Sequence, residues 1–196
     1  MKKTITIFSV FLSILFLLSG CNSSKNQGES SNYNATKTNV EKRKIEKEIS
    51  NFSTPLKSGV ANRIINIKLT CGKINELVLK NGETFSFNEV VGPCTEEEGY
   101  KKAEIYVNQQ ISYALGGGNC QVSTTLYNAA IAVSGIDIIE RHEHNGRPVD
   151  YIEDGKDATV SYNTLDLKFI NNTGNDIKLY AWCDDVNVYC KITQIS

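Results

Sequence analysis

The chain has 196 residues, with 21 lysines and arginines against 22 aspartates and glutamates, and it contains six cysteines. A hydrophobic fraction of 40% and a charged fraction of 22% are ordinary for a globular protein and exclude a multi-span membrane protein. The balanced charge argues against nucleic acid as a partner, because no basic excess is present to neutralise phosphates. The length accommodates one domain of roughly 100–150 residues with additional segments.

Residues 1–20 predict a lipoprotein signal peptide. Two lysines precede an apolar run from Ile5 to Leu18, which is shorter than the roughly 20 residues of a membrane-spanning helix. The run leads into Leu-Ser-Gly-Cys, a sequence typical of bacterial lipoproteins in which Cys21 is acylated. We therefore expect an extracytoplasmic protein that is anchored to the cell membrane through Cys21. An ordinary signal peptide or a short anchor stays open as the alternative.

The next segment, residues 21–51, predicts a flexible tether. It is rich in Ser, Asn, Thr and Lys and has almost no large apolar residue, so burial cannot offset the entropy lost on ordering. Its charged part, residues 41–48, could form a marginal solvated helix. The remaining residues, 52–196, form the candidate domain.

The first half of this domain mixes helical and extended patterns. Residues 59–79 place apolar side chains mostly at helical spacing and predict a helix. Residues 84–88 alternate as in a short strand. The β-rich runs 103–107 and 110–115 predict a hairpin.

The second half begins with a glycine-rich loop and a helix and continues with strands. Residues 120–134 predict a helix that Gly135 caps. Strands are predicted at 136–144, 158–162, 166–170, 176–182 and 186–193. The predicted fold is therefore α+β, with early helices and a glycine-rich loop leading into a central helix, packed on a mainly antiparallel sheet.

The segment from Gly116 to Thr125, Gly-Gly-Gly-Asn-Cys-Gln-Val-Ser-Thr-Thr, is the most informative stretch. The glycines allow a close backbone approach or positive φ, and Cys120 is expected in the first turn of the following helix. Unpaired amides and the helix dipole at this position stabilise a thiolate and could bind an oxyanion. A structural alternative stays open, in which Cys120 is a small buried side chain and the glycines only permit a tight turn.

The chain has two histidines, His142 and His144, which the predicted strand places on one face with Glu140. A cysteine nucleophile needs a base, and usually a third group that orients this base. The order Cys120, His144, Asp157 fits such an arrangement by analogy with papain-like enzymes.

Two other interpretations of the histidines remain. They could bind a metal ion together with Cys120 and an acid, although neither CxxC nor HExxH is present. They could also be structural, with one exposed at a strand end and the other hydrogen-bonded. No cofactor is expected.

Several motifs together resemble the VanW family over roughly residues 55–182. They are Gly82–Asn88 (GETFSFN), Val91-Gly92-Pro93, Glu98-Gly99-Tyr100, the block GGGNCQVSTTLYNA at 116–129, Glu140-Arg141-His142-x-His144 and Gly155–Val160 (GKDATV). The resemblance implies a bacterial envelope protein. Members of the family occur in some glycopeptide-resistance clusters, and others carry peptidoglycan-binding domains.

The same resemblance indicates which residues form the site. Its central block carries over Gly116, Gly117, Gly118, Cys120, Gln121, Ser123 and Thr124, and its later motifs carry over Arg141, His144 and Asp157. Among these positions we expect Cys120, His144 and Asp157 to be catalytic and the others to bind substrate. The chain departs from the family pattern at Cys71, at Cys94 and at Asn145, where serine is common.

Three functional hypotheses follow. The first is an envelope lipoprotein that acts on or binds peptidoglycan or its precursors, in its sharper form a cysteine-dependent hydrolase or transpeptidase, with helix-terminal amides and Gln121 stabilising an oxyanion. The second is a noncatalytic cell-wall binding module, in which the glycine loop and Tyr100, Tyr106 and Tyr113 line a groove. The third is a metal-dependent hydrolase that uses His142 and His144.

Four further cysteines lie in the candidate domain, where an extracytoplasmic location permits disulfides. Cys183 and Cys190 could bridge a predicted hairpin, and Cys71 could then pair with Cys94. Four cysteines allow three connectivities, so the alternatives stay open.

Overall fold

The computed structural model describes residues 45–56, 60–107, 110–144 and 149–196. The predicted signal peptide, Cys21 and most of the predicted tether lie outside these residues. In the part of the chain that is described, no helix is long and apolar enough to cross a membrane.

The domain begins earlier in the chain than predicted. Strand β1 (Glu46–Pro55) pairs antiparallel with β9 (Asn187–Ile195), so residues 46–51 belong to a sheet and not to a tether or a solvated helix. Two buried positions of β1 are polar: the Ser50 hydroxyl donates to the Ala129 carbonyl (2.7 Å), and the Thr54 hydroxyl bonds that of Thr125 (2.8 Å). A strand with a polar buried face lacks the hydrophobic alternation that sequence patterns detect.

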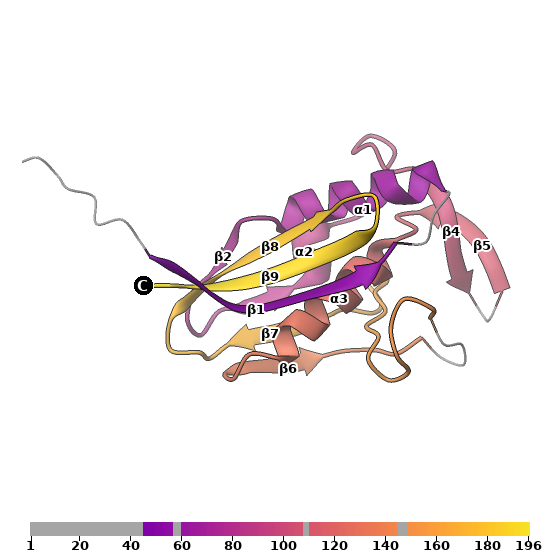
Figure 1. Cartoon of the computed structure of the whole chain (residues 1–196). Coiled ribbons are helices and arrows are strands. Elements are labelled where there is room, and N and C mark those ends of the chain that lie inside the picture. The colour runs from indigo at the N-terminus through magenta and orange to yellow at the C-terminus, as the bar shows by residue number, and fades with distance from the viewer. Residues whose placement is uncertain (1–44, 57–59, 108–109, 145–148) are drawn as a thin grey trace, which may run out of the picture. The chain divides into compact units, whose positions relative to one another are not determined.

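The largest sheet has four antiparallel strands in the order β1-β9-β8-β2 (Figure 1). Strand β8 (Asp176–Cys183) and β9 form its centre, and β2 (Leu77–Leu79) forms one edge. Alternate residues of β8 and β9 are buried, which gives the sheet one apolar face. That face supplies a large part of the hydrophobic core.

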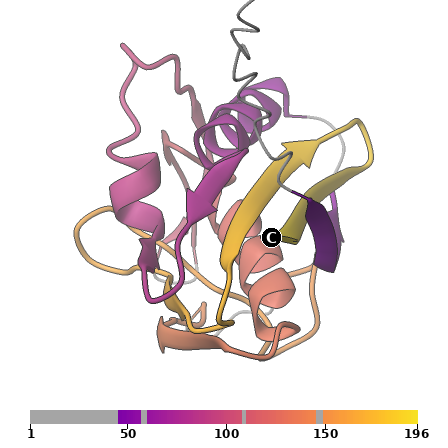
Figure 2. The same ribbon diagram turned by 90° about the vertical axis from the view of Figure 1, so that its left-hand side faces the viewer.

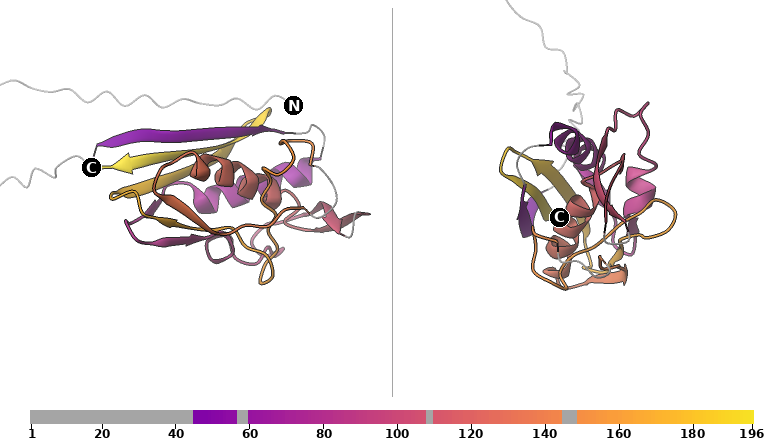
Figure 3. Two further views of the ribbon diagram at one scale, coloured as in Figure 1. Left: turned by 90° about the horizontal axis from the view of Figure 1, so that it is seen from below. Right: turned by 90° about the vertical axis from the view of Figure 1, so that its right-hand side faces the viewer.

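Two helices cover the buried face of this sheet. Helix α1 (Ala61–Ile74) packs on β8, and helix α3 (Asn119–Ile131) packs on β1, β9 and α1 (Figure 3). The predicted helix 59–79 was too long, because Glu76 has a positive φ of 67° and the chain then enters β2. Helix α3 ends at Ile131, so Gly135 is not its cap.

A smaller sheet lies on the other side of α3 (Figure 2). It has the order β3-β7-β6, with β3 at Thr84–Ser86, β7 at Lys168–Asn171 and β6 at Ile136–Glu140. The short helix α2 (Phe87–Val91), which the sequence did not predict, follows β3 directly and is capped by the Ser86 hydroxyl, which accepts from the Glu89 amide. Helix α3 is therefore enclosed by two sheets and by α1.

The predicted hairpin is confirmed as β4 (Lys102–Val107) and β5 (Gln110–Leu115), which project from the end of the molecule where α1 and α3 begin (Figure 1). Its turn lies outside the described residues. Tyr100, expected in a ligand groove, is fully buried and bonds the Thr70 hydroxyl (3.1 Å), whereas Tyr113 is exposed. The side chain of Tyr106 is not among those described.

With helices and mainly antiparallel sheets, the fold is α+β as predicted.

One predicted strand, 136–144, is confirmed only in its first part, and another, 158–162, is largely irregular chain. Strand β6 ends at Glu140, and the 158–162 segment forms only an isolated bridge between Ser161 and Leu165. Instead, the two segments contact each other: the Thr159 amide donates to the His142 carbonyl (2.8 Å). Because only isolated hydrogen bonds join these two segments, the chain after Glu140 does not continue the strand, and His142 and His144 lie outside the sheet.

All five cysteines in the described residues are free thiols. Cys183 lies opposite Val188 and Cys190 lies opposite Ala181, so the two cysteines are offset along the hairpin and do not form the predicted bridge. Cys71 is buried on α1, where burial raises its pKa to about 12 and the neighbouring Cys183 adds to the shift. The alternative pair, Cys71 with Cys94, is also not formed.

The position of β1 predicts how truncation affects stability. A chain of residues 52–196 loses the pairs that residues 46–51 make with β9, whereas a chain of residues 45–196 keeps them. At about 0.5–1.5 kcal/mol net per hydrogen bond, we expect the shorter chain to lose about 3 kcal/mol in free energy of unfolding, measured by urea denaturation. Equal stability of the two chains would contradict the assignment of β1 to the domain.

Candidate active site

Cys120 lies in the first turn of α3, at the junction with the β4–β5 hairpin. A Cβ on Gly117 would lie 2.7 Å from the Glu104 carbonyl oxygen, and Gly118 has φ +119° with Ile67 and Arg63 directly against it. Only glycine fits both positions, because one lacks space and the other requires a left-handed backbone. The glycines are packed against protein atoms, and their role here is to set where α3 and Cys120 begin.

Asp157 and His144 form the shortest polar contact near Cys120. The Asp157 Oδ2 atom accepts from the backbone amide of His144 (2.6 Å) and lies 2.6 Å from Nδ1 of its ring. Both side chains are largely buried, with 9% and 15% of their surfaces exposed. Two bonds to one oxygen fix the orientation of the imidazole, so Nε2 is left to face another group.

The Cys120 thiol lies close enough to His144 for the interaction between the two groups to shift both pKa values. Burial raises the pKa of the thiol, but the interactions with His144 outweigh it, and the net pKa of Cys120 lies below its ordinary value. Burial lowers the pKa of His144, but Cys120 and Asp157 raise it above its ordinary value. These directions favour a thiolate beside an imidazolium.

Helix α3 also holds the acid in place through its second and third turns. The Thr124 hydroxyl accepts from the Ala158 amide (2.9 Å), and Asn128 donates to the Lys156 carbonyl (2.8 Å). Asp157 lies between these two anchored residues. One helix therefore carries Cys120 and positions Asp157.

Arg141 supports the acid from the other side. Its guanidinium donates to the Asp157 carbonyl (2.6 Å) and the Gly155 carbonyl (2.8 Å), pairs with the Asp157 carboxylate (3.3 Å), and lies over the Tyr127 ring. The resemblance implied a substrate-binding role for Arg141. Its donors are instead engaged with the protein, so the geometry makes it a positioning residue for Asp157.

Gln121 and Ser123, also expected at the substrate, are buried inside the domain. The Gln121 amide donates to the Thr54 hydroxyl (3.0 Å) and the Pro55 carbonyl (2.9 Å) and accepts from Arg63 (2.8 Å). Both of its donor hydrogens are used, so its side chain has none left for an oxyanion. Ser123 is fully buried, and its hydroxyl has no hydrogen-bond partner in the described part of the chain.

The two histidines do not share a site. His142 Nε2 bonds the Glu140 carboxylate (2.9 Å), and its side chain is 38% exposed. No cluster of three or more His, Cys, Asp or Glu residues that could hold a metal ion occurs in the described ranges. The metal-site hypothesis therefore gains no support from the side chains placed there.

Sequence reasoning missed three residues around the thiol. The Thr159 hydroxyl lies 3.4 Å from the Cys120 sulfur. Tyr151 is close enough for the charges of Cys120 and Arg63 to act on its phenol, whose pKa burial raises. The Gly155–Val160 motif points to Thr159, whereas Arg63 and Tyr151 lie outside every motif that was singled out.

Comparison with known proteins places this arrangement in a family. A family model described as "VanW like protein" matches residues 62–193, about two thirds of the chain. The chain belongs to the VanW family. The matched span includes Cys120, His144 and Asp157.

Two curated relatives match a similar region. The chain is 40% identical over 134 residues to "Uncharacterized protein YoaR" of Bacillus subtilis (strain 168), covering 68% of this chain and 44% of that protein. It is 32% identical over 132 residues to "Vancomycin B-type resistance protein VanW" of Enterococcus faecalis (strain ATCC 700802 / V583), covering 65% and 47%. The VanW-like region thus spans less than half of each relative, and no solved structure matches the chain.

The pKa directions predict how Cys120 reacts with iodoacetamide. Because the pKa of Cys120 is lowered, its alkylation rate should rise with pH through a midpoint below that of the denatured chain. The rate is measured by mass spectrometry of the Cys120 peptide. His144→Ala removes the interactions that lower this pKa, so the midpoint should move up, with about a tenfold loss of neutral-pH rate per pKa unit.

His142→Ala is the matched control, because His142 contacts Glu140 and should leave the profile unchanged. If the two histidine variants have the same pH profile, the conclusion that His144 lowers the pKa of Cys120 is contradicted.

The contacts of Arg141 predict a loss of stability on its removal. Arg141→Met leaves the Asp157 and Gly155 carbonyls without their charged donor. Hydrogen bonds of charged groups contribute about 1.5–3 kcal/mol each, so we expect a decrease of about 3 kcal/mol in the free energy of unfolding.

Lys156→Met provides the comparison, because the Lys156–Glu153 pair is exposed and such pairs contribute about 0–1 kcal/mol. Urea denaturation that gives the same small change for both variants would refute the positioning role.

Proposed function

We propose that this protein is an envelope lipoprotein that carries out cysteine-dependent acyl transfer, as a hydrolase or a transpeptidase, on the peptides of peptidoglycan or its precursors. The observation that carries the proposal is the convergence of Cys120, His144 and Asp157. A thiolate, a base hydrogen-bonded to it and an acid that orients the base are the parts that nucleophilic catalysis by cysteine needs.

In the first half of the reaction, the Cys120 sulfur attacks the carbonyl carbon of a substrate amide. A carbon–sulfur bond forms and the carbon–nitrogen bond breaks, and the leaving amine takes the proton of the His144 imidazolium. The product is a thioester on Cys120 and a free amine. Asp157 keeps the His144 ring oriented for this transfer and stabilises its charged form.

In the second half, water or an acceptor amine attacks the thioester. Neutral His144 accepts the proton of the attacking group, the carbon–sulfur bond breaks, and the thiolate–imidazolium pair is restored. Water yields a carboxylic acid, and an amine yields a new amide. The backbone amide of Cys120 is the donor that this mechanism assigns to the oxyanion, since the amides of Asn119, Gln121 and Val122 already donate to the Gly116 and Gly118 carbonyls. The Gln121 side chain is engaged elsewhere.

The substrate class rests on observations outside the site. The sequence around Cys21 favours acylation and an extracytoplasmic location, where peptidoglycan is the abundant peptide-bearing polymer. The name of the enterococcal relative connects that protein with resistance to vancomycin, a glycopeptide antibiotic. Both favour the cell wall or its precursors as the substrate.

The test is incubation of the full chain with purified muropeptides, followed by liquid chromatography and mass spectrometry. We expect muropeptides that have gained one water or exchanged one amine, and a transient thioester adduct on the Cys120 peptide. Cys120→Ala should abolish both, because removal of the nucleophile removes the covalent step.

Cys94→Ala is the matched control, since Cys94 is a half-buried thiol whose pKa burial raises, and it should leave turnover intact. Unchanged muropeptides, together with a Cys120 that iodoacetamide alkylates no faster than Cys94, would overturn the proposal.

A further inference from the structure

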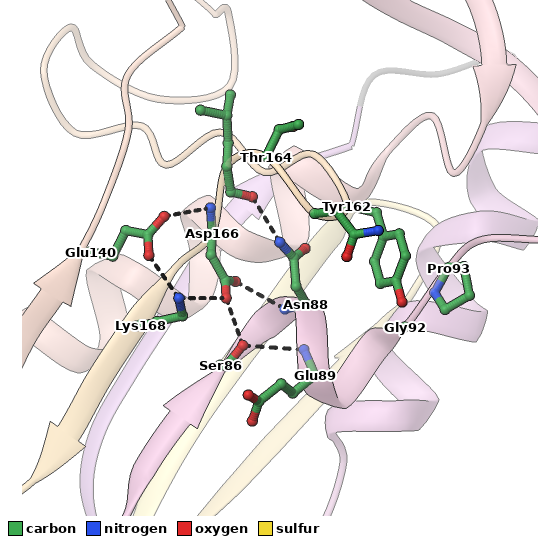
Figure 4. Close-up of a pocket in the computed structure, with 12 residues that line it drawn as sticks. Ser86, Asn88, Glu89, Gly92, Pro93, Glu140, Tyr162, Thr164, Asp166 and Lys168 are labelled. Carbon is green, nitrogen blue, oxygen red and sulfur yellow. Dashed lines mark hydrogen bonds and ion pairs between the residues drawn. The ribbon is translucent and has the colours of Figure 1, made fainter.

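A second concave site lies beside α2, at the end of the smaller sheet (Figure 4). It is a cavity of about 470 Å³ that is open to solvent on one side. Its walls come from the residues around α2, from the turn at residues 162–165 and from the ends of β6 and β7. Nothing in the proposed acyl transfer uses this cavity, and none of the residues proposed for that chemistry lines it.

The floor of the cavity is a network of charges that are already paired. Asp166 accepts from the Ser86 hydroxyl (2.6 Å) and the Asn88 amide (2.9 Å). Lys168 lies 2.9 Å from the Glu140 carboxylate and 3.7 Å from that of Asp166. The hydrogen bond from Lys168 lowers the pKa of Glu140 to about 2, so this pair stays charged. The floor is thus preformed and rigid.

This network disfavours an anionic ligand. Lys168 is the cation of the lining, and two carboxylates engage it, while Glu89 adds a further acid at the wall. A phosphate or carboxylate would therefore meet more negative than available positive charge. The ligand that fits carries no negative charge, and because the charges of the floor are already paired, we expect one that offers its own hydroxyl and amide groups to the polar lining.

The rim presents the groups that bind such a ligand. The turn from Ser161 to Leu165 is closed by backbone hydrogen bonds of 2.9 Å in both directions, so its tip is held firmly. At that tip, Tyr162 is 46% exposed, and Asn163 and Thr164 offer an amide and a hydroxyl next to it. Tyr162 and Pro93 both line the cavity (Figure 4). An exposed ring beside polar groups offers one apolar surface and several hydrogen bonds.

We propose that this cavity is a binding site for an uncharged, N-acetylated saccharide, with Tyr162 stacking on a sugar ring and the neighbouring polar groups bonding its hydroxyl and acetamido groups. One chain segment connects this cavity with Cys120. Thr159 and Val160 contact Cys120, and Tyr162 follows two residues later. Glycan binding here stands on the cavity and its lining alone and does not require acyl transfer at Cys120.

The test is titration of the full chain with chitotetraose, an uncharged N-acetylated oligosaccharide, by isothermal calorimetry and by NMR of the asparagine side-chain amides. We expect saturable binding with shifts at Asn88 and Asn163. Tyr162→Ala should weaken it about tenfold or more, and Tyr162→Phe should retain it because the ring is kept. Tyr113→Ala, which removes an exposed tyrosine of the distant hairpin, is the matched control and should bind as the unsubstituted chain does.

Two further ligands separate the alternatives. Cellotetraose, which has no acetamido groups, should bind more weakly than chitotetraose. Stronger binding of the cationic oligomer of glucosamine, abolished by Glu89→Gln, would overturn the proposal in favour of an amine site. Absence of saturable binding, or equal weakening by Tyr162→Ala and Tyr113→Ala, would also overturn it. Cys120→Ala should bind chitotetraose normally, so failure of glycan binding and failure of acyl transfer are distinguished.

Discussion

The hydrogen bonds that fix Asp157 hold together a site whose parts come from three separate segments. The carboxylate orients His144, the flanking backbone is tied to α3 through Thr124 and Asn128, and Arg141 secures the same stretch from the outside. Each partner lies on irregular chain or on a helix face, where no sheet ladder would otherwise determine its position. Without these bonds, neither the base nor the nucleophile's neighbours would have a defined geometry.

Helix α3 achieves this by being an unusually polar core helix. Several of its buried residues are polar: Gln121, Ser123, Thr124, Thr125 and Asn128. Burying such groups costs free energy unless they are hydrogen-bonded. All but Ser123 meet this condition by bonding the chain around them. These polar residues contribute less hydrophobic burial than apolar ones would. They allow α3 to form hydrogen bonds with β1 on one side and with the segment around Asp157 on the other.

The sequence alone predicted those features that depend on local chemistry. The glycine loop and the apolar spacing after it placed Cys120 at the start of a helix, and the β-rich runs 103–107 and 110–115 predicted the hairpin. It failed where long-range polar contacts decide the structure. The buried face of β1 is polar, and β6 ends at Glu140, so His142 and His144 lie on irregular chain where Asp157 binds His144. The roles of Gln121 and Arg141 depend in the same way on partners that are distant in the sequence.

The two ends of the described domain meet at one edge of the sheet, where Ile45 and Ser196 exchange backbone hydrogen bonds of 3.0 Å. Strand β1 runs from there to Pro55, whose carbonyl binds Gln121 next to the nucleophile. Ten extended residues span about 30 Å, so Ile45 and Ser196 lie at the end of the domain opposite Cys120. A group attached to Ser196 would therefore lie far from Cys120 and would not obstruct it.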